Sequence, residues 1–312
     1  MSIFLGNVAS VGKGFVNSVY GWAFPSSNNK DIIDLIKAAK DALVTGIPPE
    51  QAFGRAKEKS QMISLLMNKQ HIFLEGPPGV GKTNIVHDLA WHIAKGDLPT
   101  LQGRNIHIWT MKTVQNFSDL VKNPMHGGIQ SILEPVCIEV AKYRNEHEHY
   151  LFLDEMYGVL MNDLLATVKA CEEKNIRVIC ASLNQPSLEK SFGYNRRTPS
   201  QVLKENGVTL ISLDSMNASQ TAEVLKDYFV TLKMEVEEKY PGLTLTIEDS
   251  VITAVISYGA KKQPEKNEPY RSIRCLREFI YCSVNGPLSK QPQGVSLNAN
   301  DFLTYCTQVY IF

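Results

Sequence analysis

The chain has 312 residues, of which 44% are hydrophobic and 21% are charged, and its 32 basic side chains are balanced by 32 acidic ones. A chain of this length buries roughly 75% of its unfolded surface and suits two domains. The composition excludes a highly charged disordered chain and a disulfide-dense secreted module, and the balanced charge excludes a global attraction to nucleic acid or anionic membranes.

The first 24 residues are apolar but are interrupted by polar residues and four glycines. They lack the basic start and the continuous apolar run of a signal peptide. No apolar run in the chain reaches the ~18 residues of a membrane-spanning helix. We therefore predict a cytoplasmic protein with free thiols and treat residues 1–24 as a surface strap. Membrane contact through the aromatic side chains of this segment is the alternative.

An amphipathic helix is predicted at residues 30–44, because Ile32, Ile36 and Leu43 recur at helical spacing. From about residue 53 onward, short β-rich runs alternate with helical patterns. The strand candidates are residues 71–75, 105–109, 150–154, 176–182 and 208–213. This alternation is typical of βαβ units, so we predict an α/β fold with a parallel sheet and helices on both faces.

Beyond residue 213 the pattern becomes helical, with helices expected near residues 218–239, 249–259 and 271–283. The last 22 residues predict no clear element. We therefore divide the chain into an N-terminal segment and helix, a nucleotide-binding α/β domain, a helical lid domain and a C-terminal tail. Their predicted ranges are 1–47, 48–213, 214–290 and 291–312.

The most specific motif is GPPGVGKT at residues 76–83, a full match to the phosphate-binding loop G-x-x-x-x-G-K-[ST]. A predicted strand precedes it, and an amphipathic helix that ends at Gly96 follows it. The glycines let backbone N–H groups converge on phosphate oxygens at a helix N-terminus. Lys82 is expected to reach the β- and γ-phosphates, and the Thr83 hydroxyl to ligate Mg²⁺. The predicted nucleotide-binding residues here are Gly76, Pro77, Pro78, Gly79, Val80, Gly81, Lys82, Thr83 and Asn84.

A second motif lies about 70 residues later, where the apolar run LFL ends in Asp154 and Glu155. Carboxylates at the C-terminal edge of a parallel sheet lie where its ligands bind. Asp154 is predicted to hold Mg²⁺, and Glu155 to orient and deprotonate the attacking water.

The next predicted strand delivers Ser182, with Asn184 two residues further on. At the tip of a strand beside the phosphate-loop strand, these side chains are predicted to contact the γ-phosphate or the attacking water. The alternative is that they close a turn before Pro186.

These motifs resemble the first ATPase module of the ClpA/ClpB-type AAA+ unfoldases. The supporting stretches are PEQAFGRAKEK, GPPGVGKTNIVHDLAWHIAKGDLPTLQGRNIHIW, YLFLDEMYGVL and LTIEDSVITAVISYG with EPYRSIRCLREFIY, which together span roughly residues 50–285. The resemblance implies a three-layer AAA+ P-loop NTPase domain, a small helical lid and a hexameric ring that threads protein substrates. It also implies that Phe53, Gly54 and Arg55 lie over the adenine, with Arg271 of the lid directed toward the phosphates.

Two features depart from the family pattern. Lys204 and Glu205 occupy the positions of a pair of arginines that reach into the neighbouring subunit, and a lysine is a poor substitute for a planar guanidinium. Arg196 and Arg197 lie just upstream and are the candidates to replace them. The aromatic pore loop of the family is not recognisable in residues 117–131, where Phe117 and Met125 are the apolar candidates.

The run Glu146-His147-Glu148-His149 has the composition of a metal site. Alternation on an extended segment directs both histidines to one side without further partners, so we interpret this run as a solvated loop and not as a metal site.

These observations favour an AAA+ ATPase that binds ATP and Mg²⁺ and remodels or regulates a protein partner, with a homo-oligomeric ring as its expected assembly. The alternative is a nucleotide-gated binding module with little or no hydrolysis, favoured by the missing arginine pair and pore loop. A nucleic-acid-linked AAA+ protein is disfavoured, because no basic stripe or reader motif is present.

Overall fold

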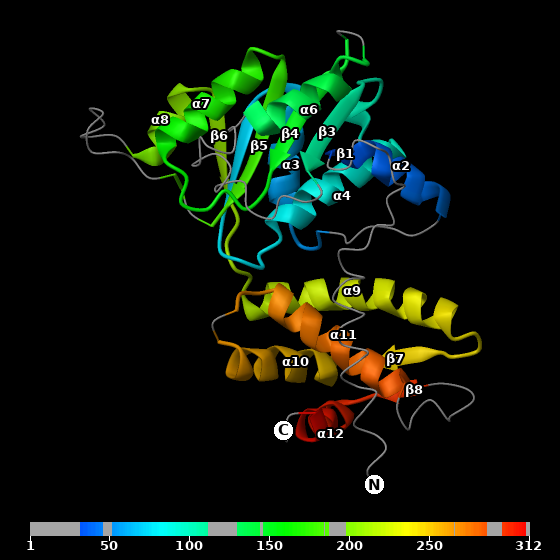
Figure 1. The fold of residues 1–312 in the computed structure, drawn as a ribbon. Helices are drawn as coiled ribbons and strands as arrows, with labels where there is room; N and C mark the ends of the chain where they lie inside the picture. Colours follow the sequence, from blue (N-terminus) through cyan, green and yellow to red (C-terminus); the bar gives the residue numbers. More distant parts are fainter. Residues whose placement is uncertain are drawn as a thin grey trace.

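The structure is a computed structural model that describes residues 32–45, 52–111, 130–143, 146–183, 185–186, 198–264, 266–285 and 295–309. The described elements form two units, an α/β unit and a smaller helical unit, which lie one above the other in Figure 1. Each unit is built around its own hydrophobic core.

The α/β unit contains one six-stranded sheet with the strand order β1-β3-β4-β5-β2-β6. All neighbouring strands are parallel except β1, which pairs antiparallel with β3 at the edge. The strands are β1 (Ile32–Asp34), β2 (His71–Glu75), β3 (Ile106–Met111), β4 (Glu148–Leu153), β5 (Ile176–Ser182) and β6 (Val208–Ser212). The predicted α/β class with a mostly parallel sheet is thereby confirmed.

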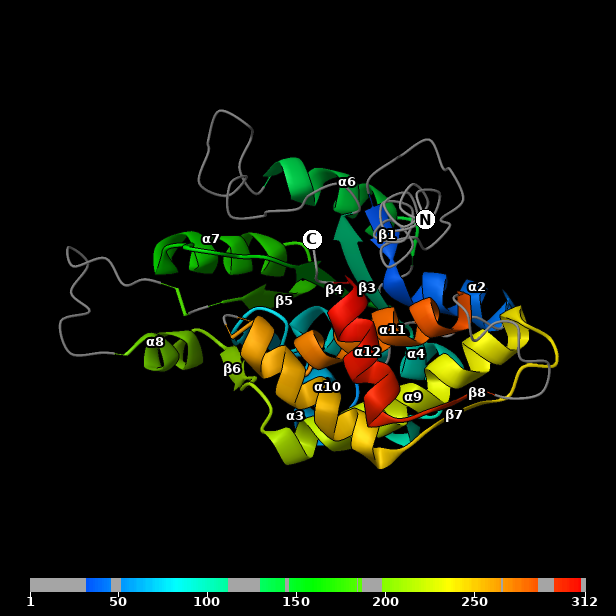
Figure 2. The same cartoon turned by 90° about the horizontal axis from the view of Figure 1, so that it is seen from below.

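Helices cover both faces of this sheet and make three layers, as Figure 2 shows. One face packs against α2 (Leu35–Thr45), α3 (Ala56–Met67) and α4 (Lys82–Lys95). The other packs against α6 (Gln130–Val140), α7 (Met161–Glu172) and α8 (Pro199–Glu205). A short 3₁₀ helix, η1 (Pro99–Leu101), follows α4. Because the central strands are buried on both faces, their sequences are continuous apolar runs.

The prediction of a continuous helix at residues 30–44 is wrong at its start. Ile32–Asp34 form β1, and α2 begins only at Leu35. Ile33 pairs with Thr110 of β3, and the Asp34 carboxylate accepts a hydrogen bond of 3.1 Å from the Ile36 N–H. Three residues are too few to separate helical spacing from strand spacing, so pairing with β3 decides the conformation.

The helical unit contains four helices and a two-stranded parallel sheet. Its elements are α9 (Ala218–Lys239), β7 (Leu245–Ile247), α10 (Asp249–Lys262), α11 (Tyr270–Asn285), β8 (Val295–Leu297) and α12 (Ala299–Val309). The three helices predicted near 218–239, 249–259 and 271–283 are confirmed. β8 and α12 lie in the range predicted as a tail, yet Leu297 and Phe302 are fully buried in the same core as α9–α11.

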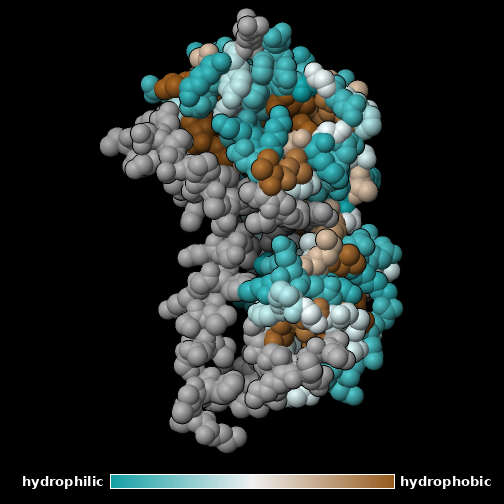
Figure 3. All heavy atoms as spheres, turned by 90° about the vertical axis from the view of Figure 1, so that its right-hand side faces the viewer, coloured by the Kyte–Doolittle hydropathy of each residue, from teal (hydrophilic) through white to brown (hydrophobic). Residues whose placement is uncertain are grey.

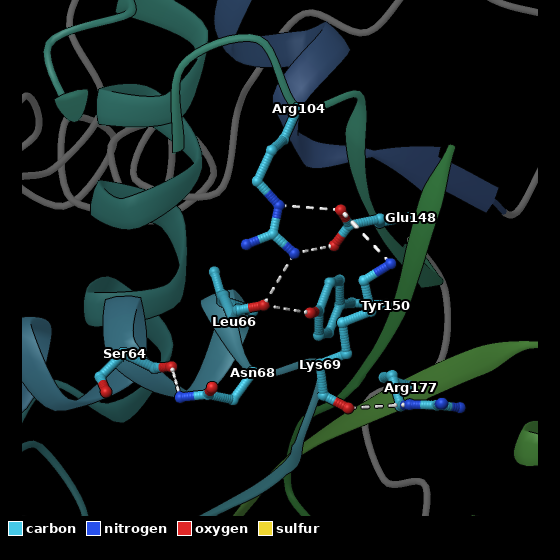
Figure 4. A network of polar contacts seen from close by, with 8 residues as sticks. All are labelled: Ser64, Leu66, Asn68, Lys69, Arg104, Glu148, Tyr150 and Arg177. Atoms are coloured by element: carbon cyan, nitrogen blue, oxygen red, sulfur yellow. Dashed lines mark hydrogen bonds and ion pairs between the residues drawn. The ribbon is translucent and has the colours of Figure 1, made fainter. Parts of the chain in front are cut away.

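The C-terminus of α3 is closed by a polar network that reaches across to the sheet (Figure 4). The Leu66 carbonyl accepts hydrogen bonds from the Tyr150 hydroxyl, at 3.0 Å, and from the Arg104 guanidinium, at 3.2 Å. Arg104 also forms an ion pair with Glu148. Arg177 donates to the Lys69 carbonyl at 2.9 Å. The last carbonyls of a helix lack partners within it, so β4, β5 and the segment before β3 supply them.

Among the residues that are coloured by hydropathy in Figure 3, the surface is mainly hydrophilic, with apolar groups separated by polar ones. In the described part of the chain, no helix combines the length and the apolar character needed to cross a membrane. All six cysteines are free thiols, and burial raises the pKa of Cys171 to about 12.

Candidate nucleotide-binding site

The phosphate-binding loop runs from the end of β2 to the start of α4, as its motif predicts. The loop begins at Gly76, where an added Cβ would lie 2.2 Å from the Leu213 carbonyl oxygen. The segment after β6 therefore passes so close that a glycine is required. The loop ends at Gly81, whose left-handed backbone (φ 98°) caps α4. The N-terminus of a 14-residue helix thus faces the loop.

Lys82 is the first residue of α4, directly after this loop, and its side chain is mostly buried. Its Nζ donates hydrogen bonds to the carbonyl oxygens of Gly76, at 2.6 Å, and Pro77, at 2.9 Å. Burial lowers the pKa of the amine, and the carboxylates of Asp154 and Glu155 partly offset this effect. The ammonium is therefore held inside the loop, at the place where the motif puts phosphate oxygens.

Thr83 and Asp154 meet although 71 residues separate them. The Thr83 hydroxyl donates a hydrogen bond of 2.6 Å to Asp154 Oδ2, and Oδ1 accepts from the Glu155 N–H at 2.9 Å. A hydroxyl and a carboxylate in contact beside a lysine are the oxygen donors that Mg²⁺ takes next to a nucleotide phosphate. The residues present therefore fit a magnesium nucleotide.

Glu155 follows β4 in a left-handed backbone conformation with φ 55°. Its side chain is exposed at the sheet edge, next to Asp154. Partial desolvation and the neighbouring Asp154 carboxylate raise its pKa, and Lys82 opposes the shift. A carboxylate with a raised pKa is a better proton acceptor, which suits a general base.

Ser182 ends β5, and β5 lies beside β2 as predicted. Its hydroxyl is buried and donates a hydrogen bond of 2.8 Å to the Met156 carbonyl. Ser182 therefore braces the segment that carries Glu155, and a contact with phosphate stays a prediction. Asn184 lies outside the described residues.

The residues N-terminal to α3 contact the loop and the helical unit. A Cβ at Gly54 would lie 2.7 Å from Val224 of α9, so this backbone packs tightly against the helical unit. Arg55 is buried and donates to the carbonyls of Val80 and Asp214. That Gly54 lies over an adenine stays a prediction, whereas the bridging contacts of Arg55 were not anticipated.

Arg271 forms its hydrogen bonds within the helical unit, and its predicted direction toward the phosphates stays a prediction. Its guanidinium pairs with Glu268 at 2.6 Å and donates to the Gln263 carbonyl at 2.9 Å. Two neighbouring residues contact the loop. Asn267 Nδ2 donates to the Pro78 carbonyl at 3.2 Å, and Tyr270 lies against Gly79. The spacing of residues within the motif could not identify Asn267 and Tyr270, because they come close to the loop only through the tertiary structure.

Other predicted positions lie away from this site or outside the described residues. Lys204 and Glu205 form the last turn of α8. The arginine candidates Arg196 and Arg197 and the pore-loop candidates Phe117 and Met125 belong to the undescribed part of the chain.

The interpretation of residues 146–149 as a solvated loop is wrong for His149, which is buried in β4. His107 supplies the partner that the prediction lacked. The His107 Nε2 is hydrogen-bonded to His147 Nδ1 at 2.9 Å, and its Nδ1 lies 2.7 Å from Asp34 Oδ2. The His107 ring also stacks on the ring of His149. In the described part of the chain, no group of three His, Cys, Asp or Glu side chains is arranged to hold a metal ion. That residues 146–149 are not a metal site stays a prediction.

Comparison with known proteins supports the resemblance found in the sequence, although no family model matches the chain. The chaperone protein ClpB of Aquifex aeolicus is 27% identical over 277 residues, which cover 78% of this chain and 26% of that protein. The ATP-binding subunit ClpE of the Bacillus subtilis Clp protease is 23% identical over 275 residues, covering 82% and 35%. The chain thus spans about a quarter to a third of the length of these relatives.

Among solved structures, the S. cerevisiae Hsp104–ADP complex superimposes with a TM-score of 0.61 over 90% of this chain and 45% of that one, at 19% sequence identity. This likeness shows the fold. The ClpB and ClpE matches show that most of the chain is similar in sequence, at low identity, to Clp-type proteins.

Proposed function

We propose that the protein binds ATP with Mg²⁺ and hydrolyses it, and that it uses the cycle to remodel or regulate a protein partner. The observation that carries the proposal is the 2.6 Å contact between Thr83 and Asp154 beside the buried amine of Lys82. This contact joins the two halves of the motif pair into one site at the edge of the sheet.

In this proposal, each residue of the site has its own role in binding or hydrolysis. Lys82 and the loop N–H groups bind and neutralise the phosphates, while Thr83 and Asp154 hold the metal ion. Mg²⁺, when bound, neutralises charge that develops on the phosphate oxygens. Glu155, with its raised pKa, orients a water and accepts its proton.

A protein partner and a ring assembly are proposed from the relatives. ClpB is a chaperone protein, and Hsp104 has been solved in complex with casein. This chain spans less than half of each of these proteins, and its protein partner and its assembly are therefore proposals.

The second candidate is a nucleotide-gated binding module with little or no turnover. The arrangement of Arg271 favours it, because that guanidinium is held by Glu268 and by the Gln263 carbonyl. The replacement of the family's arginine pair by Lys204 and Glu205 points the same way.

Steady-state ATP hydrolysis measured over a wide range of protein concentration separates the two candidates. An assembling ATPase is expected to show turnover per subunit that rises with concentration and vanishes in Glu155→Gln. Glu173→Gln is the matched control, because Glu173 is an exposed carboxylate after α7, away from the site. Tight ATP binding with turnover no higher than that of Glu155→Gln would establish the binding module. A wild-type protein that fails to bind ATP would overturn both.

A further inference from the structure

Arg55 joins three parts of the molecule through one buried guanidinium. It lies at the start of α3 and is 5% exposed. Its Nη2 donates to the Val80 carbonyl at 2.9 Å and to the Asp214 carbonyl at 2.6 Å, and Nη1 contacts Glu58 at 3.3 Å. Val80 belongs to the phosphate-binding loop, and Asp214 begins the connection to the helical unit.

The bond to Val80 has a direct relation to nucleotide. The oxygen held by Arg55 and the N–H of Gly81 belong to the same peptide group, which is planar and moves as one unit. The Gly81 N–H is among the loop donors expected to bind phosphate. A phosphate that binds this N–H therefore acts on the peptide whose other end Arg55 holds.

The connection held by Arg55 is fixed on both sides. The Leu213 N–H donates to the Glu75 carbonyl at 2.7 Å, which anchors the connection to the end of β2. The Ser215 hydroxyl accepts a hydrogen bond of 3.2 Å from the Glu268 N–H. The connection is therefore hydrogen-bonded both to the end of β2 and to the segment before α11.

That segment returns to the phosphate-binding loop. Asn267 donates to the Pro78 carbonyl, and Tyr270 packs against Gly79. The contacts form a closed circuit from the loop through Arg55, the connection and residues 267–270 back to the loop.

We propose that Arg55 is a positioning residue that couples the state of the phosphate-binding loop to the position of the helical unit. This inference rests on the proposed nucleotide binding. The planar guanidinium is needed because it offers several N–H donors in one plane and bridges two carbonyls at once, which a single ammonium does less well.

The test uses Arg55→Gln and Arg55→Lys in the full chain, with Arg104→Gln as the matched control. Arg104 is also an ion-paired arginine that binds a backbone carbonyl, but it lies in the network of Figure 4 and contacts none of the residues of the circuit. Two quantities are measured, the affinity for the non-hydrolysable Mg–AMP-PNP and the slowing of amide hydrogen exchange that it causes in residues 213–217 and 267–275.

In the wild type and in Arg104→Gln, the nucleotide is expected to slow exchange in both segments about fivefold or more. In both Arg55 variants the slowing is expected to fall below about twofold, while affinity falls by no more than about tenfold because Lys82 and Thr83 remain. If Arg55 had a purely structural role, its variants would lose melting temperature as Arg104→Gln does. The nucleotide would then slow exchange in the Arg55 variants as strongly as in the control.

Exchange slowed as strongly in Arg55→Gln as in the wild type would overturn the inference and leave the proposed function standing. Full rescue by Arg55→Lys would also overturn it, because charge alone would then suffice. If Arg55→Gln does not fold, Glu58→Gln decides, since it keeps Arg55 and removes the carboxylate that orients it. An unchanged response in Glu58→Gln would then count against the coupling. If the wild type does not bind the nucleotide, the proposed function fails and the inference fails with it.

Discussion

Burial and neighbouring charges shift the pKa values of single residues in the site. The amine of Lys82 has a lowered pKa, and the carboxyl of Glu155 has a raised one, because each is partly removed from water. Each group is also close enough to influence the other. The site therefore holds its cation and its base together before any ligand adds charge.

Replacing Lys82 by alanine is expected to abolish ATP binding, because the loop loses the buried cation that faces the phosphates. Lys95→Ala is the matched control, since Lys95 ends the same helix and is exposed. Isothermal titration with Mg–ATP checks this. Unchanged affinity in Lys82→Ala would contradict the assignment of the loop.

A second residue-scale prediction concerns His149. Burial, together with the nearby His107 and His147, lowers its pKa from the ordinary 6.5 to about 4, and Asp34 opposes the shift. Between these two pH values the unfolded chain binds more protons than the folded one, so stability falls as pH falls. His149→Gln is expected to reduce this slope, because glutamine does not take up a proton in this pH range. The glutamine oxygen can still accept the hydrogen bond from Trp109, which preserves the local packing.

Urea unfolding at pH values from 7.5 to 5 measures that slope. His92→Gln serves as the control, because His92 is a partly exposed histidine on α4. Equal slopes in wild type and His149→Gln would show that other groups carry the pH dependence.

At the scale of elements, the end of α3 depends on partners that other elements supply. Tyr150→Phe removes a buried hydrogen bond to the Leu66 carbonyl, which keeps its bond from Arg104. We expect a loss of about 0.5–1.5 kcal/mol in the free energy of unfolding, measured by urea titration. Asn68→Ala removes an exposed bond to Ser64, which water can replace, and is expected to cost less. The reverse order would contradict the role of burial.

At the scale of the whole molecule, the helical unit is proposed to extend from residue 214 to 309, since α12 completes its core. Phe302 of α12 is fully buried against Phe279 and Tyr258. Phe302→Ala is expected to destabilise the protein by about 3–5 kcal/mol in urea unfolding, because it opens a cavity. Leu303→Ala changes the adjacent residue, which is 52% exposed, and should cost far less. Equal losses would contradict the packing of α12 as described.

The sequence by itself determined the elements whose cause is local. The strands at 71–75 and 176–182 have their predicted bounds, because an apolar run with turn residues at its ends specifies a buried parallel strand. α4 ends before Gly96 as predicted, because that glycine adopts the left-handed conformation. The motif spacing also predicted that Thr83 and Asp154 share one site, and the two side chains are in contact. Their role at a nucleotide, like that of Lys82, stays a prediction.

Only the tertiary structure decided contacts between distant segments. β1 exists because β3 offers an edge to pair with, and His149 is buried beside His107 of the neighbouring strand. Arg55 and Asp214 are in contact although they are 159 residues apart, and Arg271 forms an ion pair with Glu268. Such choices depend on which groups the fold brings within hydrogen-bond distance, and no periodicity along one segment encodes that distance.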